Sequence, residues 1–99
     1  MGEGVYFRGR EKVEKKIYKY RLDVETKLEL PIGSKILSVK SQNGVIFLWA
    51  IVDTDVLNLD REVRTFIILG TGHTVPNLSL CFIDTCIIGD FVWHVFEVL

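Results

Sequence analysis

The stretch KILSVKSQNGVIFLWAIV, residues 35–52, decides the fold because it has the pattern of a β-hairpin. Its first eight residues alternate between two sets of side chains with the period of two that is typical of a β-strand. Asn43 and Gly44 come next, and Asn-Gly between two β-type runs is the strongest short-range signal for a two-residue hairpin turn. Residues 45–52 then predict a second strand whose two faces are both apolar.

Upstream of the hairpin, residues 13–28 allow two interpretations. Apolar and cationic side chains alternate within residues 18–22, as they do along a strand. The alternative is a helix, because apolar residues also recur at helical spacing, at Val13, Ile17, Tyr20, Val24 and Leu28. The tyrosine and β-branched content favours the strand. A turn at Pro31-Ile32-Gly33-Ser34 then separates this segment from the hairpin.

Downstream of the hairpin, the acidic segment 53–62 predicts a loop. Three apolar runs that are bounded by turn residues predict strands at 62–69, 80–88 and 91–98. Together these elements predict an all-β fold, with five or six short, mainly antiparallel strands that form a small barrel or sandwich. Residues 1–12 have no periodic pattern and predict a flexible N-terminal arm, which leaves residues 13–99 as a single β domain.

The composition restricts the function classes. The chain has 99 residues, of which 48% are hydrophobic and 25% charged, and its net charge is −1. This length predicts one domain, and the apolar content excludes a disordered chain. A net charge near zero argues against general nucleic-acid binding. No apolar run is long enough for a membrane span, and no signal peptide is visible, so we expect a cytoplasmic protein with no membrane association.

The two cysteines, Cys81 and Cys86, predict free thiols rather than a disulfide. Positions five apart on one strand point to opposite faces and lie about 16 Å apart, which is beyond the reach of a disulfide. Buried free thiols in a reducing cytoplasm are the simplest interpretation. Because no spacing typical of metal ligands is present, we expect neither a metal site nor a cofactor.

Two of the predicted strands, 45–52 and 91–98, have no polar face. An antiparallel sheet with one face in water alternates apolar and polar residues, and so short a chain has little structure with which to cover both sides. Either the sheet closes tightly on itself or a partner surface covers it. We therefore expect a homo-oligomer, most simply a two-fold dimer.

The first candidate site is the loop formed by Gly70, Thr71, Gly72 and His73 at the end of a predicted strand. Two glycines allow successive backbone N–H groups to converge on an anion such as phosphate, and Thr71 and His73 add side-chain donors. The alternative interpretation is a tight turn in which His73 hydrogen-bonds its own loop.

The other candidate residues are His94, Gln42, Asn43 and Trp49. His94 lies on an apolar strand, where a neutral, hydrogen-bonded core or interface histidine is the main interpretation. Asn43 has a structural role in its turn, whereas an amide at Gln42 is able to contact a base or sugar edge. Trp49 fits either the core or a stacking surface. Two charges embedded in apolar strands, Arg64 and Glu97, predict a solvated edge or a paired ion.

Several short motifs follow one another in a recognisable order. They are KIYKY (16–20), ELP (29–31), ILSV (36–39), QNG (42–44), LWAIVD (48–53), GTGH (70–73) and HVFE (94–97). Together they resemble a small domain family of unknown function that is common in tailed phages and in bacteria that carry prophages, and the resemblance covers residues 14–98. The chain departs from the usual pattern in its N-terminal arm and at Ile46-Phe47, where a more polar or cysteine-containing pair is common.

The resemblance implies a phage accessory protein, present in the host cytoplasm during infection and acting against host defence. We expect a homo-oligomer that sequesters a small phosphate-bearing, nucleotide-type signal without catalysis, with residues 70–73 on the phosphate and Gln42 and Trp49 on the base or ribose. One alternative is a protein–protein interaction module that inhibits a host enzyme. A second alternative is a small nucleotide hydrolase that uses His73 or His94 as a base.

Overall fold

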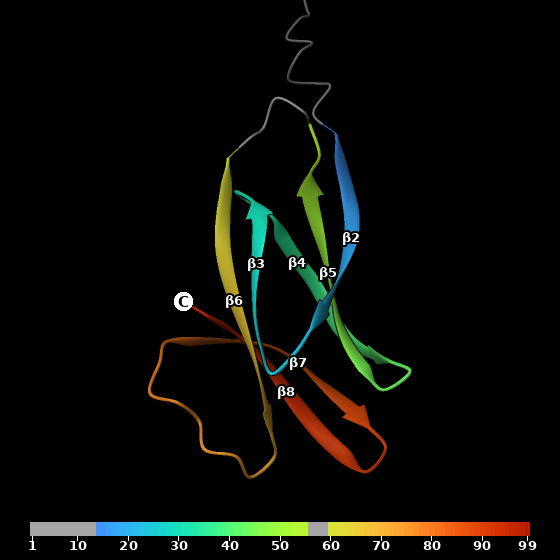
Figure 1. Cartoon of the computed structure of the whole chain (residues 1–99), viewed down its shortest axis with the longest axis vertical. Helices are drawn as coiled ribbons and strands as arrows, with labels where there is room; N and C mark the ends of the chain where they lie inside the picture. The colour runs from blue at the N-terminus through green and yellow to red at the C-terminus, as the bar shows by residue number, and fades with distance from the viewer. Residues whose placement is uncertain (1–13, 56–59) are drawn as a thin grey trace, which may run out of the picture.

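The computed structural model describes residues 14–55 and 60–99, and within these ranges the chain consists of strands and their connections (Figure 1). The strands are β2 (Lys15–Leu22), β3 (Glu25–Pro31), β4 (Lys35–Gln42), β5 (Val45–Asp53), β6 (Arg61–Gly70), β7 (Leu80–Ile88) and β8 (Phe91–Val98). The all-β prediction is confirmed. The predicted arm of residues 1–12 and the middle of the predicted acidic loop, 56–59, lie outside the described residues.

The described strands form two antiparallel sheets rather than a closed barrel, so the sandwich is the better of the two predicted forms. One sheet has the order β2-β5-β4, and the other has the order β3-β6-β8-β7. β4 and β7 lie side by side where the sheets meet, and a hydrogen bond of 3.0 Å from Ser41 Oγ to the carbonyl of Ile87 joins them (Figure 1). In Figure 1 the hairpin formed by β7 and β8 and the connection between β6 and β7 together form the lower end of the molecule.

The described residues, 14–55 and 60–99, contain one more strand than the upper limit of the prediction, because residues 15–28 form a strand, a turn and the start of a second strand. β2 pairs with β5, whereas β3 pairs with β6, so the chain crosses from one sheet to the other between them. The crossing is stabilised by the backbone N–H of Asp23, which donates to the hydroxyl of Thr26 at 2.8 Å. The helical alternative for this segment is therefore wrong.

The predicted hairpin of β4 and β5 is confirmed, with Gln42 opposite Val45. Asn43 and Gly44 have φ angles of 52° and 77°, the left-handed conformation at both positions that a type I′ turn requires. Alternate side chains of β5 then point into the sandwich, where Leu48 and Ala50 are fully buried. Among the described residues, further fully buried side chains come from β5 and from strands of both sheets: Val52, Leu30, Val39, Phe66 and Val95.

Arg64 and Glu97 form a bidentate ion pair between β6 and β8, which confirms the paired-ion interpretation. Arg64 Nε and Nη2 donate to the two carboxylate oxygens of Glu97 at 2.7 and 2.8 Å. The third guanidinium nitrogen donates to the carbonyl of Ser34. The hydrogen bonds to Glu97 raise the pKa of Arg64 above its ordinary value despite its partial burial.

Both cysteines are free, as predicted, but only one of them is buried. Cys86 lies in the core, where burial raises the pKa of its thiol. The expectation of burial is wrong for Cys81, because that side chain is exposed on β7.

Candidate functional site

The loop that follows β6 is held by hydrogen bonds within itself and to β8. The backbone N–H of His73 donates to the carbonyl of Gly70 at 3.0 Å and closes the turn. The backbone N–H of Gly70 donates to Nδ1 of the same histidine, also at 3.0 Å. The N–H of Thr71 donates to the carbonyl of Val92 at 3.2 Å. This geometry is that of the tight turn in which His73 bonds its own loop, so these three backbone N–H groups already have partners.

Gly70 allows the imidazole of His73 to lie close against the strand end. A Cβ atom at this position would lie 2.9 Å from Cε1 of His73 and 3.1 Å from Cζ3 of Trp93. The two rings meet edge to face, with centroids 6.0 Å apart. Because Nδ1 of His73 accepts a hydrogen bond, the proton of the neutral ring is on Nε2, which makes Nε2 a donor.

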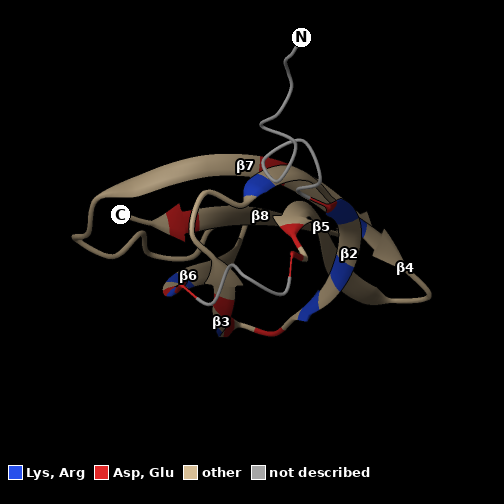
Figure 2. Cartoon of the chain, turned by 90° about the horizontal axis from the view of Figure 1, so that it is seen from above, with Lys and Arg blue, Asp and Glu red and all other residues tan. Residues whose placement is uncertain are grey.

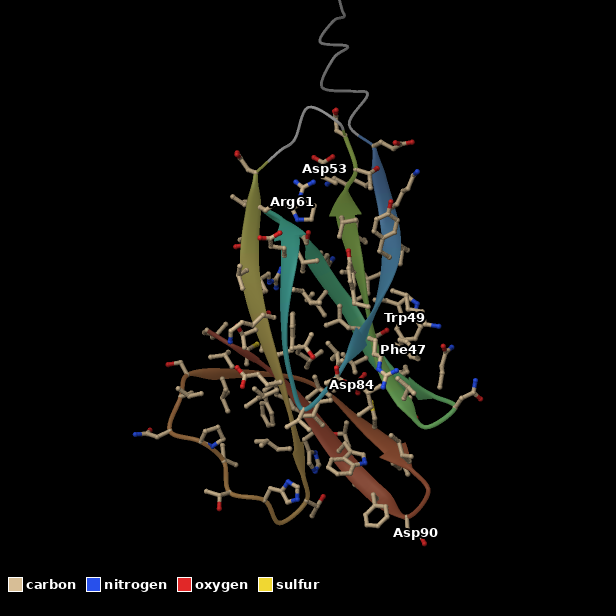
Figure 3. All side chains as sticks on the ribbon, in the orientation of Figure 1. Phe47, Trp49, Asp53, Arg61, Asp84 and Asp90 are labelled. Carbon is tan, nitrogen blue, oxygen red and sulfur yellow. The ribbon has the colours of Figure 1, made fainter. Side chains whose placement is uncertain are left out.

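A pocket of about 430 Å³ lies between this loop and the β7–β8 hairpin. We call it the end pocket, and its lining residues are Gly70, Thr71, His73, Asp90, Phe91, Val92 and Trp93. Phe91 is 68% exposed, and its ring centroid is 6.4 Å from that of Trp93. Figure 3 shows Asp90 at the tip of the hairpin, at one end of the molecule. The pocket therefore has two aromatic walls, with hydroxyl, imidazole and carboxylate groups beside them.

A second pocket of about 360 Å³ adjoins the first, because Phe91 and Trp93 line both. It reaches between the two sheets and is lined on its far side by Arg21 and Gly44. Arg21 is the cation among the residues that line this pocket, and it forms an exposed ion pair of 3.6 Å with Asp23.

His94 lies outside the end pocket, on the outer face of β8. Its Nε2 is 2.9 Å from the hydroxyl of Thr71, and its Nδ1 is 3.1 Å from the hydroxyl of Thr85 on β7. Both ring nitrogens therefore have partners, so the histidine is hydrogen-bonded as expected. Its contact with Thr71 connects it to the loop.

Three predicted site residues, Gln42, Asn43 and Trp49, lie on the β4–β5 hairpin and do not line the end pocket. Oε1 of Gln42 accepts a hydrogen bond of 2.7 Å from Nζ of Lys19. Trp49 packs against Phe47, with ring centroids 6.3 Å apart, and Figure 3 shows this pair well away from Asp90. The structure thus divides the predicted site in two.

The aromatic walls of the end pocket were not predicted from the sequence. Phe91 and Trp93 were expected only as apolar residues of a strand, 91–98, that has no polar face. The signal that marks them is the turn at Gly89-Asp90, because side chains that follow a hairpin turn at alternate positions share one face at the sheet's end.

The outer face of β6, β8 and β7 is apolar around His94. It is formed by Ile67, Leu69, Val92, Phe96, Phe82 and Ile87, which the strand registers place on one side of the sheet. Phe82 and Ile87 are 56% and 64% exposed. We call this surface the apolar outer face.

Among residues 14–55 and 60–99, no three His, Cys, Asp or Glu side chains are grouped so that they could hold a metal ion. In the same part of the chain, no helix has the length and apolar character that crossing a membrane requires.

Residues 13–99 match the model of a domain of unknown function, DUF7352. No curated protein and no solved structure matches the chain. The match confirms the resemblance to a small domain family of unknown function over nearly the whole chain.

Proposed function

The chain belongs to the DUF7352 family of domains of unknown function, and we propose that it binds and sequesters a small nucleotide-type ligand in the end pocket without catalysis. The observation that carries this proposal is the pair of aromatic walls, Phe91 and Trp93, beside the side chains of Thr71 and His73. The pocket volume of about 430 Å³ lies within the range of ordinary small-molecule sites.

A nucleobase suits the aromatic walls because any base can stack on Phe or Trp, a contact worth about 1–3 kcal/mol per base. His73 Nε2 and the hydroxyl of Thr71 supply polar contacts at the rim. A phosphate cannot use the three loop N–H groups that already have partners. Its cationic contact would instead come from Arg21 in the adjoining pocket.

Binding without turnover is supported by the state of the two histidines. Nδ1 of His73 and both nitrogens of His94 are occupied by hydrogen bonds within the protein. A general base needs an unprotonated nitrogen within reach of the proton that it removes, and the remaining nitrogen, Nε2 of His73, carries the proton of the neutral ring. This arrangement favours sequestration over the hydrolase alternative.

The biological role that we propose with this site is that of a phage accessory protein that removes a nucleotide immune signal in the host cytoplasm. The resemblance described above supports the phage context. We further propose that the chain acts as a homo-oligomer, with the apolar outer face as the contact surface, because large exposed apolar faces mark interaction sites.

A thermal-shift screen of signalling nucleotides, including cyclic dinucleotides and cyclic ADP-ribose, tests the site. A ligand at a hundredfold excess over its Kd stabilises by about 2.7 kcal/mol, which raises the Tm of a domain of this size by about 10–20 °C. Phe91→Ala and His73→Ala should reduce that shift. Tyr18→Ala is the matched control, because it removes an exposed aromatic ring on β2, outside both the end pocket and the apolar outer face. The absence of any shift across the panel, or a shift that Phe91→Ala leaves unchanged, would contradict the proposal.

The second candidate function, inhibition of a host enzyme through protein contact, is favoured by the exposure of Phe82 and Ile87. In that case Ile87→Asp abolishes capture of the enzyme, whereas Phe91→Ala leaves it intact.

A further inference from the structure

The outer face of the β2-β5-β4 sheet combines aromatic and cationic side chains. In the strand register Trp49 is flanked by Lys19 on β2. Phe47 is flanked by Lys40 on β4 and by Arg21 on β2, which lies near the end of its strand and also lines the pocket beside the end pocket. Paired residues of antiparallel strands share a face, and the opposite face of β5 is the buried one. We call these five side chains the cationic aromatic face.

The sheet that carries this face is positively charged although the chain is not. Its three strands contain six cationic residues and one acidic residue, namely Lys15, Lys16, Lys19, Arg21, Lys35 and Lys40 against Asp53. The whole chain has a net charge of −1. Figure 2 shows the cationic segments of β2 along its length. The fold therefore concentrates positive charge on one sheet, which the total charge does not reveal.

Lys19 lies over the aromatic pair. Its Nζ is 4.1 Å from the ring centroid of Phe47 and 5.7 Å from that of Trp49, and Gln42 holds it by a hydrogen bond of 2.7 Å. The side chain of Lys19 is exposed, so the ammonium group sits at the surface beside two ring faces. Cation–π contacts of this kind at exposed sites contribute about 0.5–1 kcal/mol, little enough for an anionic ligand to replace them.

Lys40 is a second exchangeable cation on this face. Its Nζ forms an ion pair of 3.0 Å with Asp84 on β7, while its own side chain is 63% exposed. Exposed ion pairs are worth about 0–1 kcal/mol, so a phosphate can compete for this ammonium group.

We propose that the cationic aromatic face binds single-stranded nucleic acid, in addition to the ligand of the end pocket. Proteins that bind single strands combine a positive surface that follows the phosphates with aromatic side chains on which the bases stack. Trp49 and Phe47 offer the stacking surfaces, and Lys19 and Lys40 the phosphate contacts. In a duplex the bases are paired and stacked inside the helix, so they are not available to stack on these rings. An acidic peptide would satisfy the cations but leave the rings without a stacked partner.

The test is fluorescence anisotropy with labelled oligothymidine and oligouridine of about 12 nucleotides, a length within the usual site size. Trp49→Ala should weaken binding about tenfold or more, since stacking is worth about 1–3 kcal/mol per base. Trp49→Phe should retain binding within about threefold, which separates the loss of stacking from unfolding. Lys19→Gln should reduce the slope of log K against log salt concentration by about 0.7, the value for one phosphate contact on a single strand.

Lys27→Gln is the matched control, because Lys27 is an exposed lysine on β3 of the other sheet and is also in an ion pair. It removes the same charge and should leave the Kd unchanged. Any one of the following results would overturn the proposal: no anisotropy change at low salt, equal affinity for a duplex of the same length, competition by polyglutamate as strong as that by the unlabelled oligonucleotide, or equal weakening by Lys27→Gln and Lys19→Gln. Loss of oligonucleotide binding in Phe91→Ala would also overturn it, by placing the strand in the end pocket.

Discussion

At the scale of single residues, the ion pair of Arg64 and Glu97 links β6 and β8 through two charged hydrogen bonds in a mostly buried position. Both side chains are mostly buried, with 19% and 14% of their surfaces exposed, and the pair has two hydrogen bonds. Removing one partner of such a pair leaves the other charge buried and unpaired. The resulting loss in the free energy of unfolding is larger than the net contribution of the intact pair.

Arg64→Met should therefore lower the free energy of unfolding by about 3 kcal/mol, because it leaves the carboxylate of Glu97 unpaired. The double variant Arg64→Met/Glu97→Leu should recover most of this loss, since no charge is then left buried. Urea unfolding measures both. A single variant within about 0.5 kcal/mol of the wild type would show that the pair is solvated instead.

At the scale of elements, the hairpin and the sheet-forming segments were predictable because their signals are local. Asn43 and Gly44 favour a type I′ turn, and the alternation of side chains on either side of them predicts two strands. The division between β2 and β3 was not predictable, because the turn at Asp23 contains neither glycine nor proline and depends on the hydroxyl of Thr26. The order of the strands in each sheet depends on contacts distant in sequence, which no local pattern encodes.

The contact between β4 and β7 predicts an acid-dependent stability. Burial acts to raise the pKa of Asp84, but the hydrogen bond from Lys40 and that from the N–H of Thr85 outweigh it, so the pKa lies below its ordinary value. A carboxyl group with a lowered pKa stabilises the fold above its unfolded-state pKa, and this contribution is lost as pH falls through the folded-state value.

Lys40→Met should lower stability at neutral pH by about 0.5 kcal/mol, because the lysine is mostly exposed. The difference from the wild type should disappear as the pH falls through the lowered pKa of Asp84. Urea unfolding at a series of pH values from neutral to about 2 measures this, with Lys27→Gln as the control. A difference that stays constant down to the lowest pH would show that the stabilisation does not depend on the ionised carboxyl group.

At the scale of the whole molecule, the candidate site was only partly predictable. The sequence placed the loop of residues 70–73 at a strand end, and the structure places its side chains around a pocket. Trp49 was predicted to share a nucleotide site with that loop, because both have side chains that are able to contact a nucleotide. The strand order instead puts Trp49 on the other sheet. Phe91 and Trp93 were expected on a covered face of their strand. Alternation of side chains shows which residues share a face, but not which of them lie beside a loop and line a pocket.

The arrangement of the whole molecule also explains why β5 and β8 have apolar side chains on both faces. The inner face of β5 is the core of the sandwich, and its outer face is occupied by Phe47 and Trp49 under Lys19. The outer face of β8 belongs to the apolar outer face, which the described part of the chain leaves exposed. Two strands with similar composition thus serve different surfaces.

The most direct test of the central claim is a two-dimensional amide NMR titration of the protein with the nucleotide that gives the largest thermal shift. We predict that the amide signals of Thr71, His73, Phe91 and Trp93 and the indole N–H of Trp93 move together and saturate, while those of Phe82 and Ile87 stay in place. Saturable changes confined to other residues, with the signals of Phe91 and Trp93 unmoved, would contradict the assignment of the ligand to the end pocket.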